Sequence, residues 1–70
     1  MIWIRTQEHE LIETGFITTA DNRIQIVAMV PGLDKIAGVG TYTEDRAKEI
    51  IEDIRVHIIK GLPVYDMPAE

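Results

Sequence analysis

A single apolar stripe near the end of the sequence limits what this chain can fold into. Five apolar residues recur at the spacing i, i+3, i+4, i+7 and i+11, which places them on one side of an α-helix. They are Ala47, Ile50, Ile51, Ile54 and Ile58. Thr43 fits the N-cap of such a helix, and Lys60 followed by Gly61 fits its end. The pattern predicts one amphipathic helix of about 18 residues over 43–60, whose apolar side needs a second layer to cover it.

The residues that precede this helix have the character of β-strands. Aromatic and β-branched residues are enriched in them, and several segments alternate apolar and polar positions. The expected strands are residues 1–6, 15–20, 23–30 and 35–42, with a short strand or bulge at 11–14. The predicted fold class is α+β, an antiparallel meander of three to five strands packed on one C-terminal amphipathic helix.

The turns between these strands carry their own signals. Asp21 and Asn22 both tolerate positive φ and fit a two-residue hairpin turn. Pro31 followed by Gly32 fits the central positions of a type II turn.

The length of the chain limits its core. Seventy residues make one small domain, which we expect over 1–61. Residues 62–70 hold two prolines and are expected to form an extended or loosely ordered tail. The chain has no cysteine, which fits a reducing compartment. Self-association is then the remaining usual way to reinforce so small a core.

Charge and hydropathy argue against several classes of function. The net charge of −5 argues against general nucleic-acid binding, because contacts to phosphates need a surplus of basic residues. The first residues lack the basic segment and the long apolar stretch of a signal peptide. The longest apolar run, 26–30, is too short to cross a bilayer. We therefore expect a soluble, cytoplasmic protein with no membrane contact.

The strands carry more apolar residues than one helix can cover. The positions expected beneath the helix are Ile2, Ile4, Ile24, Ile26, Ala28 and Val30. The alternate positions include Trp3, Val27 and Met29, which predicts an apolar patch on the open face of the sheet. A homo-oligomer, most simply a two-fold dimer, is the first interpretation of this patch. The alternative is that a long loop or the tail folds over the open face.

The Gly-Val-Gly segment at 38–40 lies just before the helix, where phosphate-binding loops occur. It lacks the third glycine of a dinucleotide fingerprint and the Gly-Lys-Ser/Thr ending of a P-loop. Glu44 and Asp45 would repel a phosphate there, whereas they stabilise the start of a helix. We interpret the segment as the end of a strand before a helix cap, formed by Thr43 or by a capping box of Thr41 and Glu44.

No pattern of residues indicates an active site. His9 and His57 are not paired by spacing with other metal ligands, and the chain has neither serine nor cysteine to act as a nucleophile. We expect no catalysis, no metal and no cofactor. The candidate ligand or interface residues are Trp3, Arg5, Arg23, Val27, Met29 and Tyr42. The aromatic rings and arginines of this set fit a small nucleotide-like ligand or, as the favoured interpretation, a subunit contact.

Residues 3–7 read Trp-Ile-Arg-Thr-Gln, and 40–54 read Gly-Thr-Tyr-Thr-Glu-Asp-Arg-Ala followed by an Ile-rich helix. Both segments resemble a group of small proteins from low-GC Gram-positive bacteria, their phages and their integrated elements. Those proteins have Leu where this chain has Val39, and Glu where it has Asp45. The resemblance implies a ββββα accessory protein of a phage or mobile element and supplies no catalytic residues. The tail after Lys60 goes beyond the shared pattern.

The expected function is that of a small phage or mobile-element accessory protein, located in the cytoplasm of the host cell. It would act by binding, as a homo-oligomer that modulates or antagonises a host protein. The first alternative is an oligomeric protein that binds or sequesters a nucleotide-like small ligand. The second alternative is a purely structural interaction protein.

Overall fold

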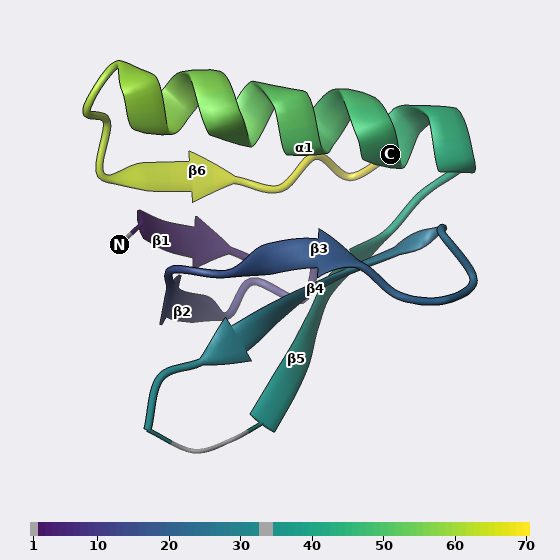
Figure 1. The fold of residues 1–70 in the computed structure, drawn as a ribbon, viewed down its shortest axis with the longest axis horizontal. Helices are drawn as coiled ribbons and strands as arrows, with labels where there is room; N and C mark the ends of the chain where they lie inside the picture. Colours follow the sequence, from purple (N-terminus) through teal and green to yellow (C-terminus); the bar gives the residue numbers. More distant parts are fainter. Residues whose placement is uncertain (1, 33–34) are drawn as a thin grey trace.

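The chain forms an α+β fold in which a helix follows five strands and precedes a sixth. The structure is a computed structural model that describes residues 2–32 and 35–70. Within these residues there are six strands and one helix, which confirms the predicted fold class. The elements are β1 (Ile2–Arg5), β2 (Leu11–Thr14), β3 (Ile17–Thr19), β4 (Gln25–Val30), β5 (Lys35–Thr41), α1 (Glu44–Ile59) and β6 (Val64–Asp66) (Figure 1).

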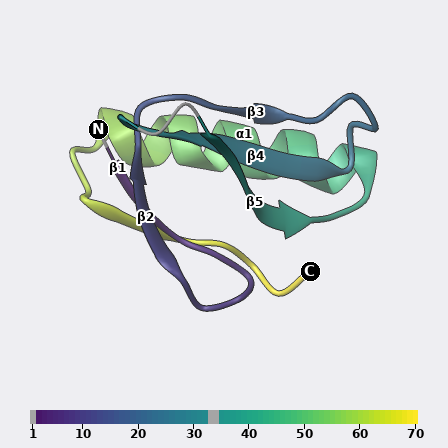
Figure 2. The ribbon, with the colours of Figure 1, turned by 90° about the horizontal axis from the view of Figure 1, so that it is seen from below.

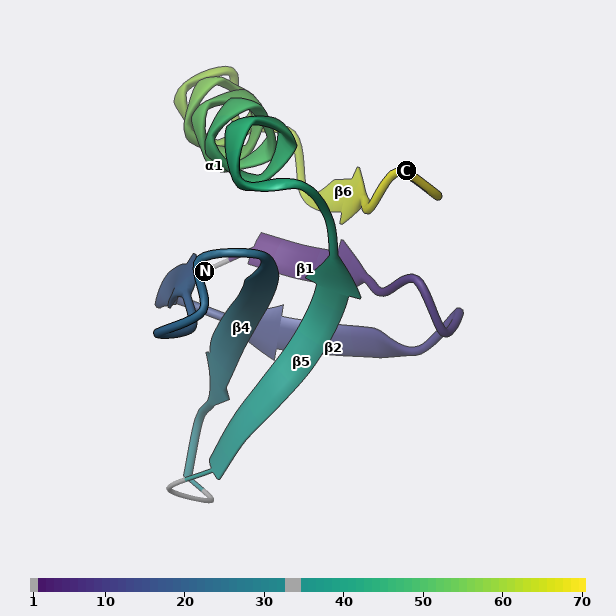
Figure 3. The ribbon, with the colours of Figure 1, turned by 90° about the vertical axis from the view of Figure 1, so that its right-hand side faces the viewer.

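The first sheet has the strand order β2-β1-β6. β1 and β2 form an antiparallel hairpin, whereas β6 pairs with β1 in parallel and lies between β1 and α1 (Figures 1 and 3). Within 62–70, the segment expected to be an extended or loosely ordered tail, Val64–Asp66 contribute a strand to this sheet. The prolines that indicated a loose tail border the strand: Pro63 precedes it and Pro68 follows it, so neither interrupts its ladder.

The second sheet has the order β3-β4-β5, in which consecutive strands pair antiparallel. The amide of Ala20 donates to the carbonyl of Gln25 at 2.8 Å, so the first loop comprises 21–24 and the predicted two-residue turn is wrong. The Asn22 side chain accepts two backbone amides within this loop, and Arg23 has a φ of 61°. An asparagine cap and one residue with positive φ stabilise the longer loop.

The second turn of this sheet begins at Pro31. Gly32 has a φ of 81°, as the third position of a type II turn requires. The rest of the predicted turn falls on 33–34, outside the described residues. Val30 pairs with Lys35, so the connection comprises 31–34.

The two sheets are joined where the chain passes from β2 to β3. Figure 2 shows β1 and β2 crossing the direction of β3 and β4. Thr14 ends β2 and is fully buried; its hydroxyl donates to the carbonyl of Met29 at 2.7 Å and accepts the amide of Phe16 at 3.2 Å. Gly15 follows in the bend. A strand that bends from one sheet into the next is a usual way to make such a corner.

The helix covers the inner faces of both sheets. Thr43 is its N-cap and accepts the amide of Arg46 at 3.2 Å, which confirms the simpler of the two predicted caps. Thr41 lies within β5, so the capping box of Thr41 and Glu44 does not form. α1 ends one residue before Lys60, with Gly61 at a φ of 71°. No helix among the described residues is long and apolar enough to cross a membrane.

The core lies between α1 and the two sheets. Its buried members are Ile2, Ile4, Ile26, Ala28, Val39, Tyr42, Ala47, Ile50, Ile54, Tyr65 and Met67. Three positions expected to be covered lie at its margin. Ile24 belongs to the loop before β4, Val30 lies at the end of β4 and is partly exposed, and Ile58 lies in the last turn of α1 and is 54% exposed.

Candidate interaction surfaces

The six residues selected from the sequence do not converge on one site. Trp3 and Arg5 lie on the outer face of the first sheet, pointing away from the core. Arg23 lies in the loop before β4, where its guanidinium group is 3.6 Å from the carboxylate of Glu44. Tyr42 lies in the core. In a single chain, therefore, the aromatic rings and the arginines are not assembled around one ligand.

Tyr42 has a structural role in this arrangement. Its hydroxyl donates to the carbonyl of Pro68 at 2.6 Å. Burial raises the pKa of its phenol, the nearby Tyr65 raises it further, and Arg46 acts in the opposite direction. The ring also explains a glycine, because a Cβ at Gly40 would lie 2.7 Å from ring atoms of Tyr42.

The Gly-Val-Gly segment lies within β5 and is part of a β-bulge. Ile26 pairs with Gly40 and Val27 pairs with Gly38, so Val39 is an extra residue between them. The bulge turns the Val39 side chain into the core, where it is buried. These contacts support the interpretation of the segment as a strand end, since both glycines face neighbouring side chains of the fold.

The outer face of the first sheet mixes apolar and charged side chains. Trp3 is opposite Glu13 on β2 and Val64 on β6. Arg5 is opposite Leu11 on β2 and Asp66 on β6. The exposed members of this face are Trp3, Arg5, Leu11, Glu13, Val64 and Asp66. A face of this kind tolerates water, and its tryptophan and arginine are also typical of protein contacts.

The outer face of the second sheet carries an apolar row that extends from the residue before β3 across β4 to β5. Met29 pairs directly with Ile36 on β5, and its amide donates to the carbonyl of Phe16 at 3.0 Å on the other side. The exposed fractions are 57% for Phe16, 44% for Met29 and 67% for Ile36. We call these three residues the outer row. They lie toward the far ends of β4 and β5, which extend away from α1 (Figure 3).

Val27 was expected on this open surface but is only 9% exposed. It is not a member of the core cluster, so it is buried at the outer face itself. Its cross-strand partners are Thr18 and Gly38, and the Gln25 side chain lies over Gly38. The prediction that Val27 is open to a partner is therefore wrong, whereas Trp3 and Met29 are exposed as expected.

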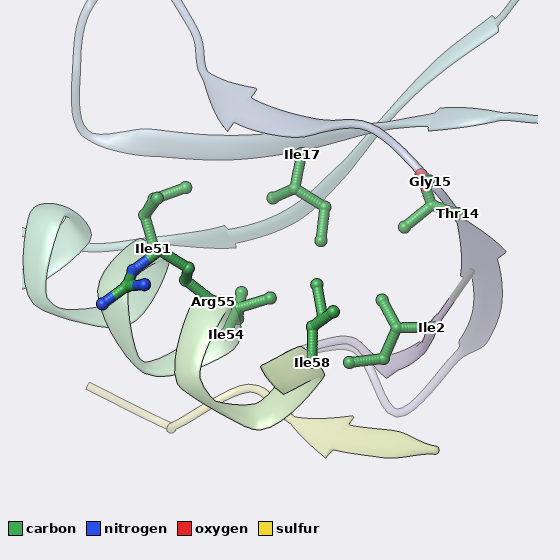
Figure 4. A pocket seen from close by; sticks show the side chains of 8 residues that line it. All are labelled: Ile2, Thr14, Gly15, Ile17, Ile51, Ile54, Arg55 and Ile58. Atoms are coloured by element: carbon green, nitrogen blue, oxygen red, sulfur yellow. The ribbon is translucent and has the colours of Figure 1, made fainter. Parts of the chain in front are cut away.

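A groove of about 440 Å³ runs between the second half of α1 and the bend that joins β2 to β3 (Figure 4). Its residues are Ile2, Thr14, Gly15, Ile17, Ile51, Ile54, Arg55 and Ile58. The volume is within the range of small-molecule sites, and the lining is mainly isoleucine. Arg55 donates to the carboxylate of Glu52 at 2.9 Å, which lowers the pKa of Glu52, so the charge at the edge of the groove is already balanced.

The buried polar side chains of the described residues are hydrogen-bonded within the fold. Every buried side-chain nitrogen and oxygen in this part of the chain has a hydrogen-bond partner. No three histidine, aspartate or glutamate side chains in 2–32 and 35–70 lie close enough together to hold a metal ion. His9 and His57 lie far apart in the fold: His9 has a φ of 64° in the β1–β2 turn, whereas the His57 ring contacts Tyr65.

No protein-family model matches this chain, and no curated protein or solved structure matches it. Its surfaces therefore have to be interpreted from their own geometry.

Sequence reasoning missed Phe16 and Ile36, the two outer members of the row. The expected strand bounds of 23–30 and 35–42 already leave the connection at 31–34 and place Ile36 opposite Met29, so Ile36 could have been selected from the sequence. Phe16 gave no such signal, because the bend after Thr14 changes which face each residue occupies. The contacts made by Gln7 were also missed, since they join segments more than 30 residues apart.

Proposed function

We propose that this protein acts by binding, as a homo-oligomer whose subunits meet through the outer row. The observation that carries the proposal is the exposure of three neighbouring apolar side chains, Phe16 before β3, Met29 on β4 and Ile36 on β5. Burial of such side chains against a second copy removes apolar surface from water. A two-fold axis through the row would place the same residues on both sides, as in most dimers.

The cellular role that we propose is that of a phage or mobile-element accessory protein acting in the host cytoplasm. The resemblance of 3–7 and 40–54 supports this role. We further propose that such an oligomer modulates or antagonises a host protein through the outer face of the first sheet. Trp3 and Arg5 support this assignment, because exposed tryptophan and arginine are enriched among residues that dominate binding energy.

Light scattering at several protein concentrations tests the oligomer. The wild-type chain is expected to exceed the 7.9 kDa of a monomer. Met29→Lys keeps a side chain of similar length but places a charge in the middle of the row, so it is expected to weaken association at least tenfold, or about 1.4 kcal/mol. A wild-type mass of one chain at every concentration would refute the proposal.

Leu11→Lys is the matched control, because Leu11 is an exposed apolar strand residue on the other sheet, at 56% against 44% for Met29. It adds the same charge and is expected to leave the mass unchanged. An equal loss of mass in both variants would assign the effect to charge alone. Capture of host proteins by the wild type and by Trp3→Ala then tests the role of the first sheet.

A further inference from the structure

Residues after α1 bind the rest of the protein as an added β-strand does. β6 follows β1 in parallel register, with Trp3 opposite Val64 and Ile4 opposite Tyr65. The amide of Trp3 donates to the carbonyl of Pro63 at 2.9 Å, and the amide of Met67 donates to the carbonyl of Arg5 at 2.9 Å. Alternate side chains of the segment, Tyr65 and Met67, enter the core. This is the pattern by which proteins capture extended peptides: main-chain hydrogen bonds combined with pockets for every second side chain.

Three side chains from distant parts of the sequence hold the segment beyond β6. The Gln7 amide group donates to the carbonyls of Ala69 at 2.9 Å and Pro68 at 3.2 Å. The Tyr42 hydroxyl donates to the same Pro68 carbonyl, and Arg46 Nε donates to the main-chain oxygen of Glu70 at 3.1 Å. Every acceptor in this set is a main-chain oxygen. These side chains therefore bind the backbone of an extended segment, and the same segment from another chain would offer the same oxygens.

The connection between α1 and β6 is short and contributes nothing to the core. Residues 60–63 are all exposed. The amide of Gly61 donates to the carbonyl of Ile58 and that of Leu62 to His57, the two bonds of a Schellman motif. This motif needs the positive φ of 71° at Gly61. The direction of the segment therefore depends on one backbone conformation that glycine adopts easily and other residues do not.

We propose that the binding site formed by β1, Gln7, Tyr42 and Arg46 also accepts residues 64–70 of a second copy, so that two chains exchange their C-terminal strands. The contacts that residues 64–70 make with β1, Gln7, Tyr42 and Arg46 are the same in the closed and the exchanged forms. The two forms therefore differ mainly in the conformation of residues 60–63 and in the cost of association, which is the usual basis of domain swapping. This contact is separate from the outer row and does not depend on it.

Engineered cysteine pairs test the exchange in the full-length chain, which has no cysteine of its own. Arg5 and Asp66 are register partners, both exposed on the outer face, so Arg5→Cys with Asp66→Cys is placed for a disulfide. In a closed chain this disulfide forms within one molecule, whereas exchange gives a covalent dimer. We expect the covalent dimer to increase with the protein concentration during refolding. Only intramolecular disulfides at every concentration would overturn the proposal.

The matched control pairs Arg5→Cys with Leu11→Cys, which are partners within the β1–β2 hairpin and do not involve the tail. It should give intramolecular disulfides and no concentration-dependent dimer. Both pairs are placed in a Met29→Lys background, which removes the contact through the outer row. The cysteine pairs therefore test the strand exchange alone, whereas light scattering of Met29→Lys tests the contact through the outer row.

Gly61→Ala sharpens the test, because the closed form then requires alanine at positive φ. A cost of about 1 kcal/mol is a factor of about five for each hinge, and one exchanged dimer relieves two hinges, so the ratio of exchanged dimer to closed monomer should rise roughly 25-fold while most chains are closed. Gly32→Ala imposes the same strain at a φ of 81° in the other sheet and also meets open space, so the ratio should not change. An equal response to both substitutions would contradict the assignment of residues 60–63 as the hinge.

Discussion

The two sheets differ in how they are assembled and in what their outer faces present. The first sheet joins β1 to β6 in parallel across α1, and Gln7 and Tyr42 fix the residues that follow β6. The second sheet consists of consecutive antiparallel strands and presents an apolar row on its outside. The first sheet therefore depends on long-range polar contacts within the chain. The second is complete locally and exposes apolar side chains on its outer face.

Thr14 connects the two sheets, and its replacement should have the largest effect on stability. Thr14→Val keeps the shape but removes the hydroxyl that serves the Met29 carbonyl and the Phe16 amide in a buried site. We expect the free energy of unfolding to fall by about 2–3 kcal/mol, because buried groups lose their hydrogen-bond partners. Denaturant titration at a fixed protein concentration measures this change.

Thr18→Val is the control for Thr14→Val, since Thr18 is exposed on β3. It should change the free energy of unfolding by less than about 0.5 kcal/mol. If Thr14→Val were equally mild, apolar contacts alone would hold the sheets together. A lower denaturant slope in Thr14→Val would instead indicate that the sheets unfold separately, and that result would strengthen the contrast between them.

Alkaline pH should act on the first sheet and the tail before it acts on the second sheet. Burial raises the pKa of both Tyr42 and Tyr65; Asp53 adds to the effect at Tyr65, and Arg46 opposes it at both. Because the folded-state pKa of each phenol lies above its usual value near 10, this stabilisation is fully present below pH 10. It is lost as the pH rises through the folded-state pKa.

Two tyrosine variants separate these contributions. Tyr42→Phe should cost about 1 kcal/mol at neutral pH, because the bond to the Pro68 carbonyl is lost, and it should also reduce the alkaline loss. Tyr65→Phe should cost less at neutral pH and likewise reduce the alkaline loss. Unfolding free energies between pH 8 and 11 measure both effects. An unchanged alkaline loss in both variants would contradict the role of the phenols.

The second sheet and the helix were largely predictable because their signals are local. Strand composition gave the segments that contain β4 and β5, and apolar spacing with Thr43 gave the helix to within one residue at each end. The predictions that were wrong in this sheet also have a physical cause. A four-residue loop at 21–24 and a bulge at Val39 each change which side chains share a face.

The first sheet was less predictable because β6 is defined by a distant partner. Val64 to Asp66 show no clear strand pattern, and their pairing with β1 depends on a chain reversal by the whole helix. The same difference between local and distant signals explains why only part of the candidate surface was predicted. The alternation within β1 indicated that Trp3 is exposed, whereas the burial of Tyr42 depends on Pro68, 26 residues away.

The most local effect is expected at the helix cap, which links the second sheet to the tail. Thr43→Ala removes the bond to the Arg46 amide and should cost about 1 kcal/mol, whereas Thr41→Ala should cost less because Thr41 does not cap the helix. Arg46 also holds the Glu70 main-chain oxygen, so loosening the first helical turn should speed hydrogen exchange in β6. Exchange in β3 and β4 should change little, since their ladder does not involve that turn. Equal acceleration of hydrogen exchange in both sheets would show that the two sheets open as one unit. The difference between the second sheet, made of consecutive strands, and the first sheet, made by pairing β1 with the distant β6, would then not affect their dynamics.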